Sequence, residues 1–278
     1  MFRADLHCHS THSDGQKSPK DLVLLAKKIG LSGLSITDHD AIGAYEEVYN
    51  FAQEQKIELL SGLELSCGYS LNGHHDSSES VHVLGYGFNN KDPGLKELCE
   101  KACLDRKIRN YAIADKLGEK QMPIDVAGLY QGNSAGSIGR PHLAQEMLEK
   151  GYVSSFKEAF IEFLGDGKSC FVPLERISVE KGIEFIHKAH GFAVLAHPHL
   201  LKNSSLEEEL LKLNFDGIEA RYAKMPSKRN ARFEAFAKQK GWLISAGSDF
   251  HGEGISFASL GDSFVGKEVF DQLKQGRV

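Results

Sequence analysis

The sequence lacks long apolar runs, paired cysteines and an excess of basic charge. No stretch of its 278 residues approaches membrane-spanning length, and the first residues have neither the basic segment nor the apolar run of a signal peptide. Its five cysteines are odd in number and form no Cys-x-x-Cys pair, which argues against thiolate zinc sites and redox motifs. We therefore expect a cytoplasmic protein with reduced, buried thiols.

Positive charge is scarce as well. Lys and Arg number 33 against 38 Asp and Glu, for a formal net charge of -5, and the basic residues are dispersed. Such a chain offers no broad positive surface for duplex nucleic acid, so an anionic ligand must be captured locally. We expect a small phosphorylated substrate and neither duplex nucleic acid nor a membrane as partner, and the sequence carries no evident signal of a protein partner or an oligomer.

Strand-like runs alternate with helical segments along most of the chain, whose hydrophobic content of 41% is enough for a substantial core. The expected strands are residues 3–8, 33–37, 57–65, 81–86, 169–173, 192–196, 217–220 and 242–246. Helices between them are expected to begin near Ser18, Ala41, Ser178, Ser205 and Ser227. This alternation predicts an α/β fold with a parallel sheet, and seven or eight such units favour closure into a barrel.

One long segment interrupts the alternation, because residues 93–165 show only helical patterns. Within it, Pro141 is expected to start a helix that Gly151 ends. We therefore expect residues 1–92 and 166–278 to form the barrel and residues 93–165 to form an inserted small helical cap subdomain.

Histidines and carboxylates recur at the ends of the expected strands. They are His7, His9, Asp14, His39, Glu64, His82, His197, Asp249 and His251. Barrel enzymes place their sites at the carboxyl ends of strands, and two histidines two residues apart on a strand share one face. Glu64 ends an apolar run, where a buried carboxylate is costly unless a cation or hydrogen bonds compensate it.

Each of these residues also has an ordinary structural interpretation. A His-x-His pair can be two polar strand residues, Asp14-Gly15 is a common turn signal, and Asp40 before a helix is usually an N-cap. Their shared placement at several strand ends favours metal ligation for all but Asp40. Nitrogen and carboxylate ligands without thiolates suit manganese, zinc or iron, and catalysis is the natural use of such a site.

The motifs that contain these residues resemble the PHP (polymerase and histidinol phosphatase) family of metallophosphoesterases. The matching segments are residues 5–10, 37–40, 62–64, 82–86, 196–198 and 247–251, and they stand in the family's order along nearly the whole chain. The stand-alone branch that includes nucleoside 3',5'-bisphosphate phosphatases and 5'-3' exoribonucleases looks most similar. The resemblance implies a distorted (β/α)7 TIM-like barrel with a helical insertion.

The resemblance also implies three metal sites that share ligands. One metal would be held by His7, His9, Glu64 and Asp249, a second by Glu64, His82 and His197, and a third by Asp14, His39 and His251. Glu64 would then bridge two ions. Mn²⁺ is favoured, and Zn²⁺ or Fe²⁺ also suits these ligands.

Substrate contacts are expected in the insertion, in the segment Gly139-Arg140-Pro141-His142. A guanidinium and an imidazole at a helix start can bind phosphate, and members of the family bind substrate there. Without the resemblance, an ordinary surface ion pair of Arg140 would be the simpler interpretation. We expect Arg140 and His142 to act in catalysis and substrate binding.

The chain departs from its nucleotide-acting relatives at two anion contacts. Those relatives often carry Gly-Arg after the Ala-His-Pro motif and an arginine where Gln145 stands, whereas this chain has His199-Leu200. A 3',5'-bisphosphate is therefore a less secure substrate, and His199 is a candidate replacement contact.

Other polar residues of the insertion and loops are expected to lie outside the site. Arg106 and Arg109 lie on a helix of the insertion and could face the barrel mouth to hold a second phosphate or a nucleotide sugar, but a solvated helix face is the preferred interpretation. His74, His75 and Asp76 are interpreted as part of an exposed polar loop.

The expected activity is metal-dependent hydrolysis of phosphate monoesters, either of nucleotides such as 3',5'-bisphosphates or at the 5' ends of short RNA. A water shared by two metal ions would be the nucleophile, and the leaving-group acid is unassigned. Alternatives are a phosphatase for histidinol phosphate or another small metabolite, and a non-catalytic metal-binding regulatory module. A hydrolase of C–N bonds of the amidohydrolase type also begins with His-x-His, but the motifs at 37–40 and 247–251 argue against it.

Overall fold

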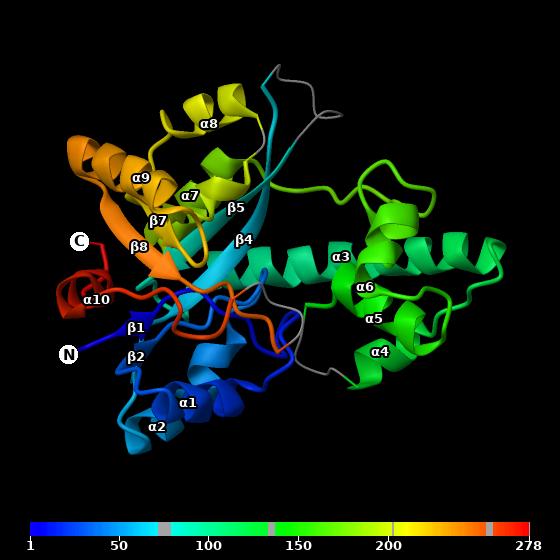
Figure 1. Cartoon of the computed structure of the whole chain (residues 1–278), viewed down its shortest axis with the longest axis horizontal. Coiled ribbons are helices and arrows are strands. Elements are labelled where there is room, and N and C mark those ends of the chain that lie inside the picture. Colours follow the sequence, from blue (N-terminus) through cyan, green and yellow to red (C-terminus); the bar gives the residue numbers. More distant parts are fainter. Residues whose placement is uncertain (72–78, 133–136, 202, 254–257, 278) are drawn as a thin grey trace.

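The strands form two sheets in a computed structural model that describes residues 1–71, 79–132, 137–201, 203–253 and 258–277 (Figure 1). The three-stranded sheet is parallel and contains β1 (Ala4–Asp5), β2 (Gly33–Leu34) and β3 (Glu58–Leu59). The five-stranded sheet has the order β4 (Gly62–Tyr69), β5 (Glu79–Tyr86), β6 (Phe192–Leu195), β7 (Gly217–Tyr222) and β8 (Leu243–Gly247).

The expected all-parallel sheet is wrong. β5 runs antiparallel to both β4 and β6, while β6, β7 and β8 are parallel. Only residues 70–78 separate β4 from β5, which is too short for the crossover that parallel neighbours need. The expected strand at 57–65 is two strands, β3 and β4, and the described residues 169–173 form no strand.

The two sheets meet through backbone contacts at the strand ends. Leu6 N donates to Ala246 O over 3.2 Å and Asp249 N donates to His7 O over 2.8 Å, which joins the chain after β1 to the end of β8. A bridge between His39 and Glu64 joins the chain after β2 to β4. The α/β class is confirmed. The described strands do not form a closed barrel, so the barrel stays a prediction.

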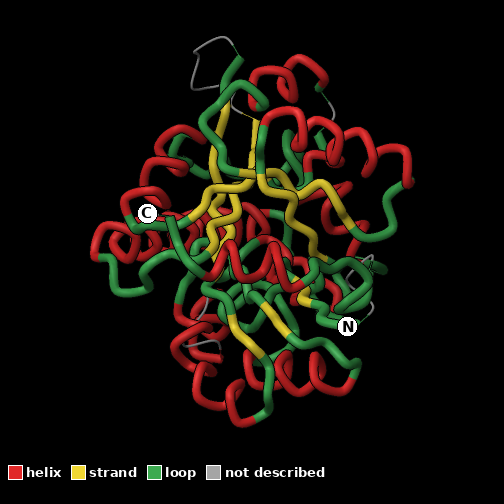
Figure 2. Tube along the Cα trace, turned by 90° about the vertical axis from the view of Figure 1, so that its left-hand side faces the viewer, coloured by secondary structure: helices red, strands yellow, loops and turns green. Residues whose placement is uncertain are grey.

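Helices cover the outside of the strands, as Figure 2 shows. α1 (Pro19–Lys28) and α2 (Gly43–Glu54) pack on the three-stranded sheet, and α7 (Val179–Lys188), α9 (Ser227–Lys240) and α10 (Lys267–Lys274) pack on the five-stranded sheet. α8 (Ser204–Leu210) precedes β7.

Two helix starts expected from serines are confirmed by their caps. The side chain of Ser18 accepts a hydrogen bond from Asp21 N, and that of Ser178 accepts one from Lys181 N. These caps satisfy backbone donors that the first helical turn leaves open.

The segment 93–165 is helical wherever it is described. It contains α3 (Pro93–Glu119), α4 (Val126–Gly132), α5 (Arg140–Glu149), α6 (Phe156–Glu158) and the π-helical turn η2 (Ala159–Leu164), which extend to the right of the sheets in Figure 1. α3 belongs to both halves: Leu95 and Leu98 pack into the core of the five-stranded sheet, whereas Ile113 and Leu117 pack into a separate core with Leu143. The division into two domains stays a prediction.

All five cysteines are free thiols, as expected, and all but Cys103 are buried. None of the described helices combines the length and the apolar character that a bilayer span requires.

Candidate metal centre

The structure brings all nine predicted ligands together. Three overlapping groups have ligand atoms within 4.8 Å of one another, and they are His7, His9, Glu64 and Asp249; His39, Glu64 and His82; and His9, Asp14, His39 and His251. His197 joins through Glu64. Side chains from six separate motifs therefore surround one space.

The first group matches the predicted first metal site. Oε2 of Glu64 lies 3.4 Å from His7 Nε2 and 3.3 Å from His9 Nε2. Oδ1 of Asp249 lies 3.2 Å and 3.1 Å from the same two nitrogens. Two imidazole nitrogens and two carboxylate oxygens thus face one another, and such a group could hold a divalent metal ion.

The second group is centred on the other oxygen of Glu64. Its Oε1 lies 2.9 Å from His82 Nδ1 and 3.0 Å from His197 Nε2, and these two nitrogens are 3.1 Å apart. His39 Nδ1 also lies 3.1 Å from Glu64 Oε2. Glu64 therefore stands between two ligand groups, as a bridging carboxylate would.

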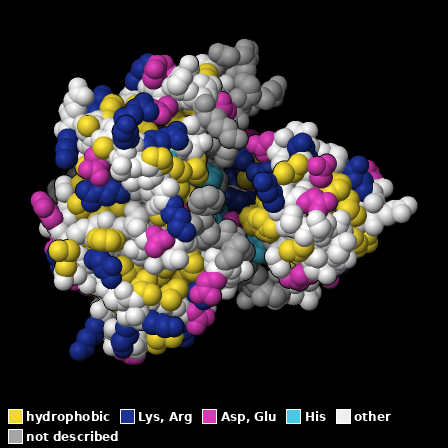
Figure 3. Space-filling model, in the orientation of Figure 1, with side chains coloured by type: hydrophobic (Ala, Val, Ile, Leu, Met, Phe, Trp, Pro, Cys, Tyr) yellow, Lys and Arg dark blue, Asp and Glu magenta, His cyan; other side chains and the backbone are white. Residues whose placement is uncertain are grey.

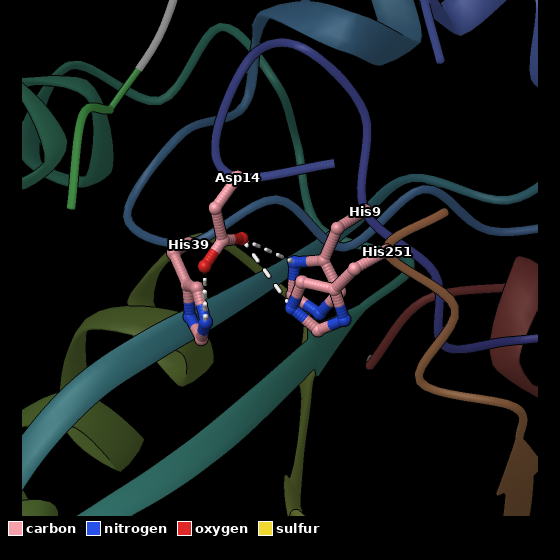
Figure 4. Close-up of side chains that lie close together, drawn as sticks. All are labelled: His9, Asp14, His39 and His251. Carbon is pink, nitrogen blue, oxygen red and sulfur yellow. Dashed lines mark ion pairs between the residues drawn. The ribbon is translucent and has the colours of Figure 1, made fainter. Parts of the chain in front are cut away.

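The third group surrounds Asp14 (Figure 4). Its carboxylate oxygens lie 3.4 Å from His251 Nε2, 3.8 Å from His9 Nδ1 and 3.9 Å from His39 Nε2. The predicted set named Asp14, His39 and His251 only. The structure adds His9, whose two ring nitrogens face different groups.

Backbone geometry at the strand ends turns these side chains inward. His197 after β6 and Asp249 after β8 have positive φ angles of 24° and 53°. Left-handed backbone is unfavourable for residues with a side chain, and strained backbone is enriched at functional sites. A Cβ on Gly247 would lie 2.1 Å from Cβ of His7, so glycine is needed for β8 to pass this close to the first ligand.

Among the residues that the structure describes, four atoms of the centre are buried and find no hydrogen-bond partner. They are His7 Nε2, Asp14 Oδ1, His39 Nδ1 and Glu64 Oε2. Buried polar atoms in folded proteins are nearly always paired, and four unpaired atoms around one space need an explanation. Divalent cations would satisfy them together, so the residues fit a metal centre.

The pKa values of the buried groups also show that positive charge is favourable in the centre. Burial alone would raise the pKa of Glu64, yet the imidazoles of His82, His39 and His7 hold it well below its usual range. Burial alone would lower the pKa of His7, but the carboxylates of Glu219, Asp249 and Glu64 raise it well above its usual range. The buried carboxylates therefore stay ionised, and positive charge beside them stabilises this form.

Sequence analysis missed two residues that hold the ligands in place. Glu219 on β7 is fully buried, and its carboxylate lies 3.0 Å from His7 Nδ1 and accepts from His197 N over 2.7 Å. A hydrogen bond at Nδ1 directs Nε2 of His7 toward the centre. Tyr222 donates its hydroxyl to Asp249 Oδ2 over 2.8 Å. A charged residue inside the apolar strand around Ile218 was the available signal for Glu219.

The predicted substrate residues lie at the start of α5. Arg140 donates to Leu164 O over 3.0 Å and to Asp166 Oδ1 over 2.7 Å, so it makes the ion pair of the simpler interpretation. His142 accepts from Gly139 N at Nδ1 over 3.1 Å, and burial lowers its pKa. Its Nε2 then carries the proton. The roles of Arg140 and His142 in binding and catalysis stay predictions.

The side chain of His199 is buried. Its ring stacks 5.8 Å from Tyr222 and lies 4.8 Å from Phe233, with 3% of the residue exposed. Burial lowers its pKa to about 4, which leaves the ring neutral. As a substrate contact it stays a prediction, and its ring neighbour Tyr222 is the residue that donates to Asp249.

The prediction of a solvated face for Arg106 and Arg109 is wrong. They are only 8% and 5% exposed, and the loop after β2 contacts Arg106. Arg106 Nε donates to Asp40 Oδ2 over 2.9 Å. Asp40 is therefore no N-cap, and Ile42 occupies that position in α2. His74, His75 and Asp76 lie outside the described residues.

Comparison with known proteins agrees with these motifs. A model of the PHP domain matches residues 5–150. A 5'-3' exoribonuclease of Haemophilus influenzae is 34% identical over 255 residues, which is 89% of either chain. A 3',5'-nucleoside bisphosphate phosphatase of Chromobacterium violaceum is 30% identical over 275 residues, covering 94% of this chain and 91% of its own.

Solved structures share the fold over nearly its full length. A Bifidobacterium adolescentis protein described as a candidate metal-dependent phosphoesterase superimposes with a TM-score of 0.86 at 24% identity, covering 99% of this chain and 96% of its own. A Chromobacterium violaceum protein described as an amidohydrolase with bound sulfate and no metal gives 0.84 at 26% identity, with 98% and 96% covered.

Proposed function

Because the chain belongs to the PHP domain family, we propose that it hydrolyses phosphate monoesters of nucleotides, or the 5' ends of short RNA, with the help of divalent cations. Its motifs predicted this family, and the prediction is confirmed. The chain is a hydrolase of phosphoester bonds. The observation that carries the proposal is the buried Glu64, whose two oxygens face five imidazoles.

We assign the cations to three sites around Glu64 and Asp14. The first site is His7, His9, Glu64 and Asp249; the second is Glu64, His82 and His197, with His39 nearby; the third is Asp14, His39 and His251, with His9 nearby. The nitrogen and carboxylate donors favour Mn²⁺ and also accept Zn²⁺ or Fe²⁺. Cations held there would polarise a phosphoryl oxygen and lower the pKa of water.

The chain's own residues would position the ester against this centre. Residues 93–165 form the proposed cap, and Arg140 and His142 stand at the start of α5, where the helix dipole favours an anion. His142 would donate its Nε2 proton to a phosphate oxygen. Glu219 would hold the tautomer of His7, so that Nε2 stays a ligand.

A screen with added Mn²⁺ tests the proposal. Phosphate or nucleotide release is measured from adenosine 3',5'-bisphosphate, a 5'-phosphorylated RNA trimer and histidinol phosphate. We expect turnover of at least one of the first two that stops when a chelator is added. Turnover of histidinol phosphate alone would replace the nucleotide substrate by a small metabolite.

The same assay separates the other candidates. A regulatory module would bind the nucleotide without metal-dependent turnover. A C–N hydrolase would leave all three esters intact and cleave an amide or cyclic amide instead. Either result from metal-loaded protein would contradict the proposal.

A further inference from the structure

His9 has carboxylate oxygens near both of its ring nitrogens. Its Nε2 lies 3.3 Å from Glu64 Oε2 and 3.1 Å from Asp249 Oδ1, in the first group of ligands. Its Nδ1 lies 3.8 Å from Asp14 Oδ1, and Figure 4 shows the Asp14 carboxylate directed toward this ring. A neutral imidazole binds a cation through the nitrogen that carries no proton. The position of one proton therefore decides which nitrogen of His9 is available to a metal.

A buried hydroxyl group lies closer to Nδ1 than the Asp14 carboxylate does. Ser13 Oγ is 3.4 Å from His9 Nδ1, and Ser13 is fully buried. A serine hydroxyl has one proton to donate and lone pairs that accept, so its contact with an imidazole is compatible with either tautomer. The direction of this hydrogen bond depends on where the hydroxyl proton of Ser13 points.

Asp38 fixes the direction of the Ser13 hydroxyl. Ser13 donates its proton to Asp38 Oδ1 over 2.7 Å, which is the shorter of the two contacts of this hydroxyl. With its proton directed at Asp38, the oxygen of Ser13 has only lone pairs left for His9. His9 Nδ1 must then be the donor, and Nε2 is the nitrogen without a proton.

The carboxylate of Asp38 is itself held in place by two more donors. Its Oδ1 accepts from Ser10 N over 2.7 Å, and its Oδ2 accepts from Ser10 Oγ over 2.6 Å. Ser10 Oγ in turn accepts from His12 N over 3.0 Å, so its own proton points to Asp38. Three donors thus surround a carboxylate that accepts at both oxygens, and Asp38 has no proton to return to Ser13.

This hydrogen-bond chain lies deep in the molecule. Ser10 and Ser13 are fully buried, and Asp38 is 1% exposed, so bulk water does not compete for the Ser13 hydroxyl. The same loop also contacts the helical segment, because His12 O accepts from Ser137 N over 2.6 Å. Figure 3 shows histidine side chains, in cyan, in the hollow where the two halves of the molecule meet.

The other histidine of the His-x-His pair has a comparable arrangement. Glu219 lies 3.0 Å from His7 Nδ1 and directs Nε2 of that ring toward Glu64 and Asp249. His7 is thus oriented by a carboxylate directly, and His9 by a carboxylate that acts through a hydroxyl. Both chains of hydrogen bonds leave Nε2 free on the side of the first group.

We propose that Ser13, oriented by Asp38, is a positioning residue that keeps the proton of His9 on Nδ1 and so makes Nε2 the metal ligand. The proposal rests on the proposed function only in that a divalent cation occupies the first site. Neither Ser13 nor Asp38 belongs to a predicted ligand set. Their role is to decide which atom of His9 the cation meets, and the affinity of that site depends on it.

NMR of the full chain loaded with Zn²⁺ tests the position of the proton directly, since Zn²⁺ has a filled d shell and does not broaden the signals. The histidines are labelled with ¹⁵N and assigned, and correlations between ring protons and ring nitrogens show which nitrogen carries the proton. We expect a proton on Nδ1 of His9 and the metal on Nε2. A proton on Nε2, with the metal on Nδ1, would overturn the proposal.

Ser13→Ala removes the acceptor from Nδ1, and Ser35→Ala is the matched control. Ser35 is equally buried, and its hydroxyl finds no hydrogen-bond partner among the residues that the structure describes. Mn²⁺ titrations followed by calorimetry should show one class of site weakened about tenfold in Ser13→Ala, with the number of bound ions unchanged. Ser35→Ala should bind Mn²⁺ as wild type does.

The spectrum of Zn²⁺-loaded Ser13→Ala separates positioning from a merely structural role. We expect the Nδ1 proton signal of His9 to be lost through exchange with water in this variant and to persist in Ser35→Ala. Equal Mn²⁺ affinity in wild type and Ser13→Ala would overturn the proposal. So would the loss of a whole ion from Ser13→Ala, because Ser13 would then act through the neighbouring Asp14.

Metal binding and ring NMR need no substrate, so they are independent of turnover. A chain that hydrolyses none of the esters, yet has its His9 proton on Nδ1 and weakened Mn²⁺ binding in Ser13→Ala, would refute the proposed function and leave this inference standing. An active chain with the His9 proton on Nε2 would refute this inference alone.

Discussion

Two charged clusters lie side by side in this molecule, and their compositions are opposite. Around Glu64, buried carboxylates are surrounded by imidazoles whose unpaired atoms face one space. Around Arg109, guanidinium groups outnumber the carboxylates that pair with them. The first cluster has carboxylates at its middle, and the second has an excess of positive charge. The net charge of -5 therefore says little about ligands, because local composition decides what each cluster holds.

The contrast between the two clusters depends most strongly on the proposal that the Glu64 cluster binds metal. Glu64→Gln keeps the size of the side chain but removes the charge that faces five imidazoles. We expect activity to fall about a thousandfold or more and bound metal to fall with it, because several kcal/mol of transition-state stabilisation depend on the cations. Phosphate release and elemental analysis measure the two effects.

Glu58→Gln is the matched control, because Glu58 makes only surface ion pairs with Lys267 and Lys274. It should retain activity and metal. Normal metal content in Glu64→Gln would show that the first cluster is structural.

The boundary between the clusters is the buried pair of Asp40 and Arg106. Asp40→Asn leaves the guanidinium without its carboxylate, and we expect the free energy of unfolding to drop by about 3 to 5 kcal/mol. Urea denaturation measures this drop. Asp115→Asn, at an exposed position of α3, should change stability by less than about 0.5 kcal/mol.

The pH dependence of this loss follows from the pKa of Asp40. Burial alone would raise that pKa, but the guanidinium of Arg106 holds it below the ordinary value of an aspartate. A lowered carboxyl pKa contributes stability above the unfolded value, and that stability is lost as the pH falls through the folded value. The difference between wild type and Asp40→Asn should stay full above pH 4 and narrow below it. A constant difference down to pH 2 would contradict the pairing.

A smaller loss of activity is expected from a change at Glu219, which contacts His7 and His197 but is not one of the predicted metal ligands. Glu219→Gln can no longer hold the tautomer of His7 with a charge, so the Mn²⁺ concentration for half-maximal activity should rise about 10- to 100-fold. Saturating Mn²⁺ should restore much of the rate. A lower rate with unchanged metal dependence would assign Glu219 a different role.

The smallest effect is expected from Tyr222, which orients one oxygen of Asp249. Tyr222→Phe removes a single hydrogen bond to a carboxylate, so metal affinity should weaken about tenfold. Titration with Mn²⁺ followed by calorimetry measures it. Unchanged affinity would mean that the strand ends alone hold Asp249 in place.

The sequence was sufficient for the first cluster and not for the second. Predicted ligands such as His7 and Asp249 follow β1 and β8, where side chains converge whatever the details of the sheet, whereas Glu64 lies inside β4 and not at the end of a strand as expected. The burial of Arg106 and Arg109 could not be predicted, because the pattern of one helix does not show which distant loop covers it.

The antiparallel direction of β5 was not predicted, for a related reason. β4 and β5 have the apolar pattern of buried strands in either direction, and only the short connection at 70–78 indicates an antiparallel pair. Glu219 could have been found, since a carboxylate inside an apolar strand needs a partner.

A crystal of the chain grown with Mn²⁺ and measured at the manganese absorption edge tests the central claim most directly. The account predicts anomalous density between the carboxylate of Glu64 and the nitrogens of His7 and His82. Manganese bound elsewhere on the protein, with no density within reach of Glu64, would contradict it.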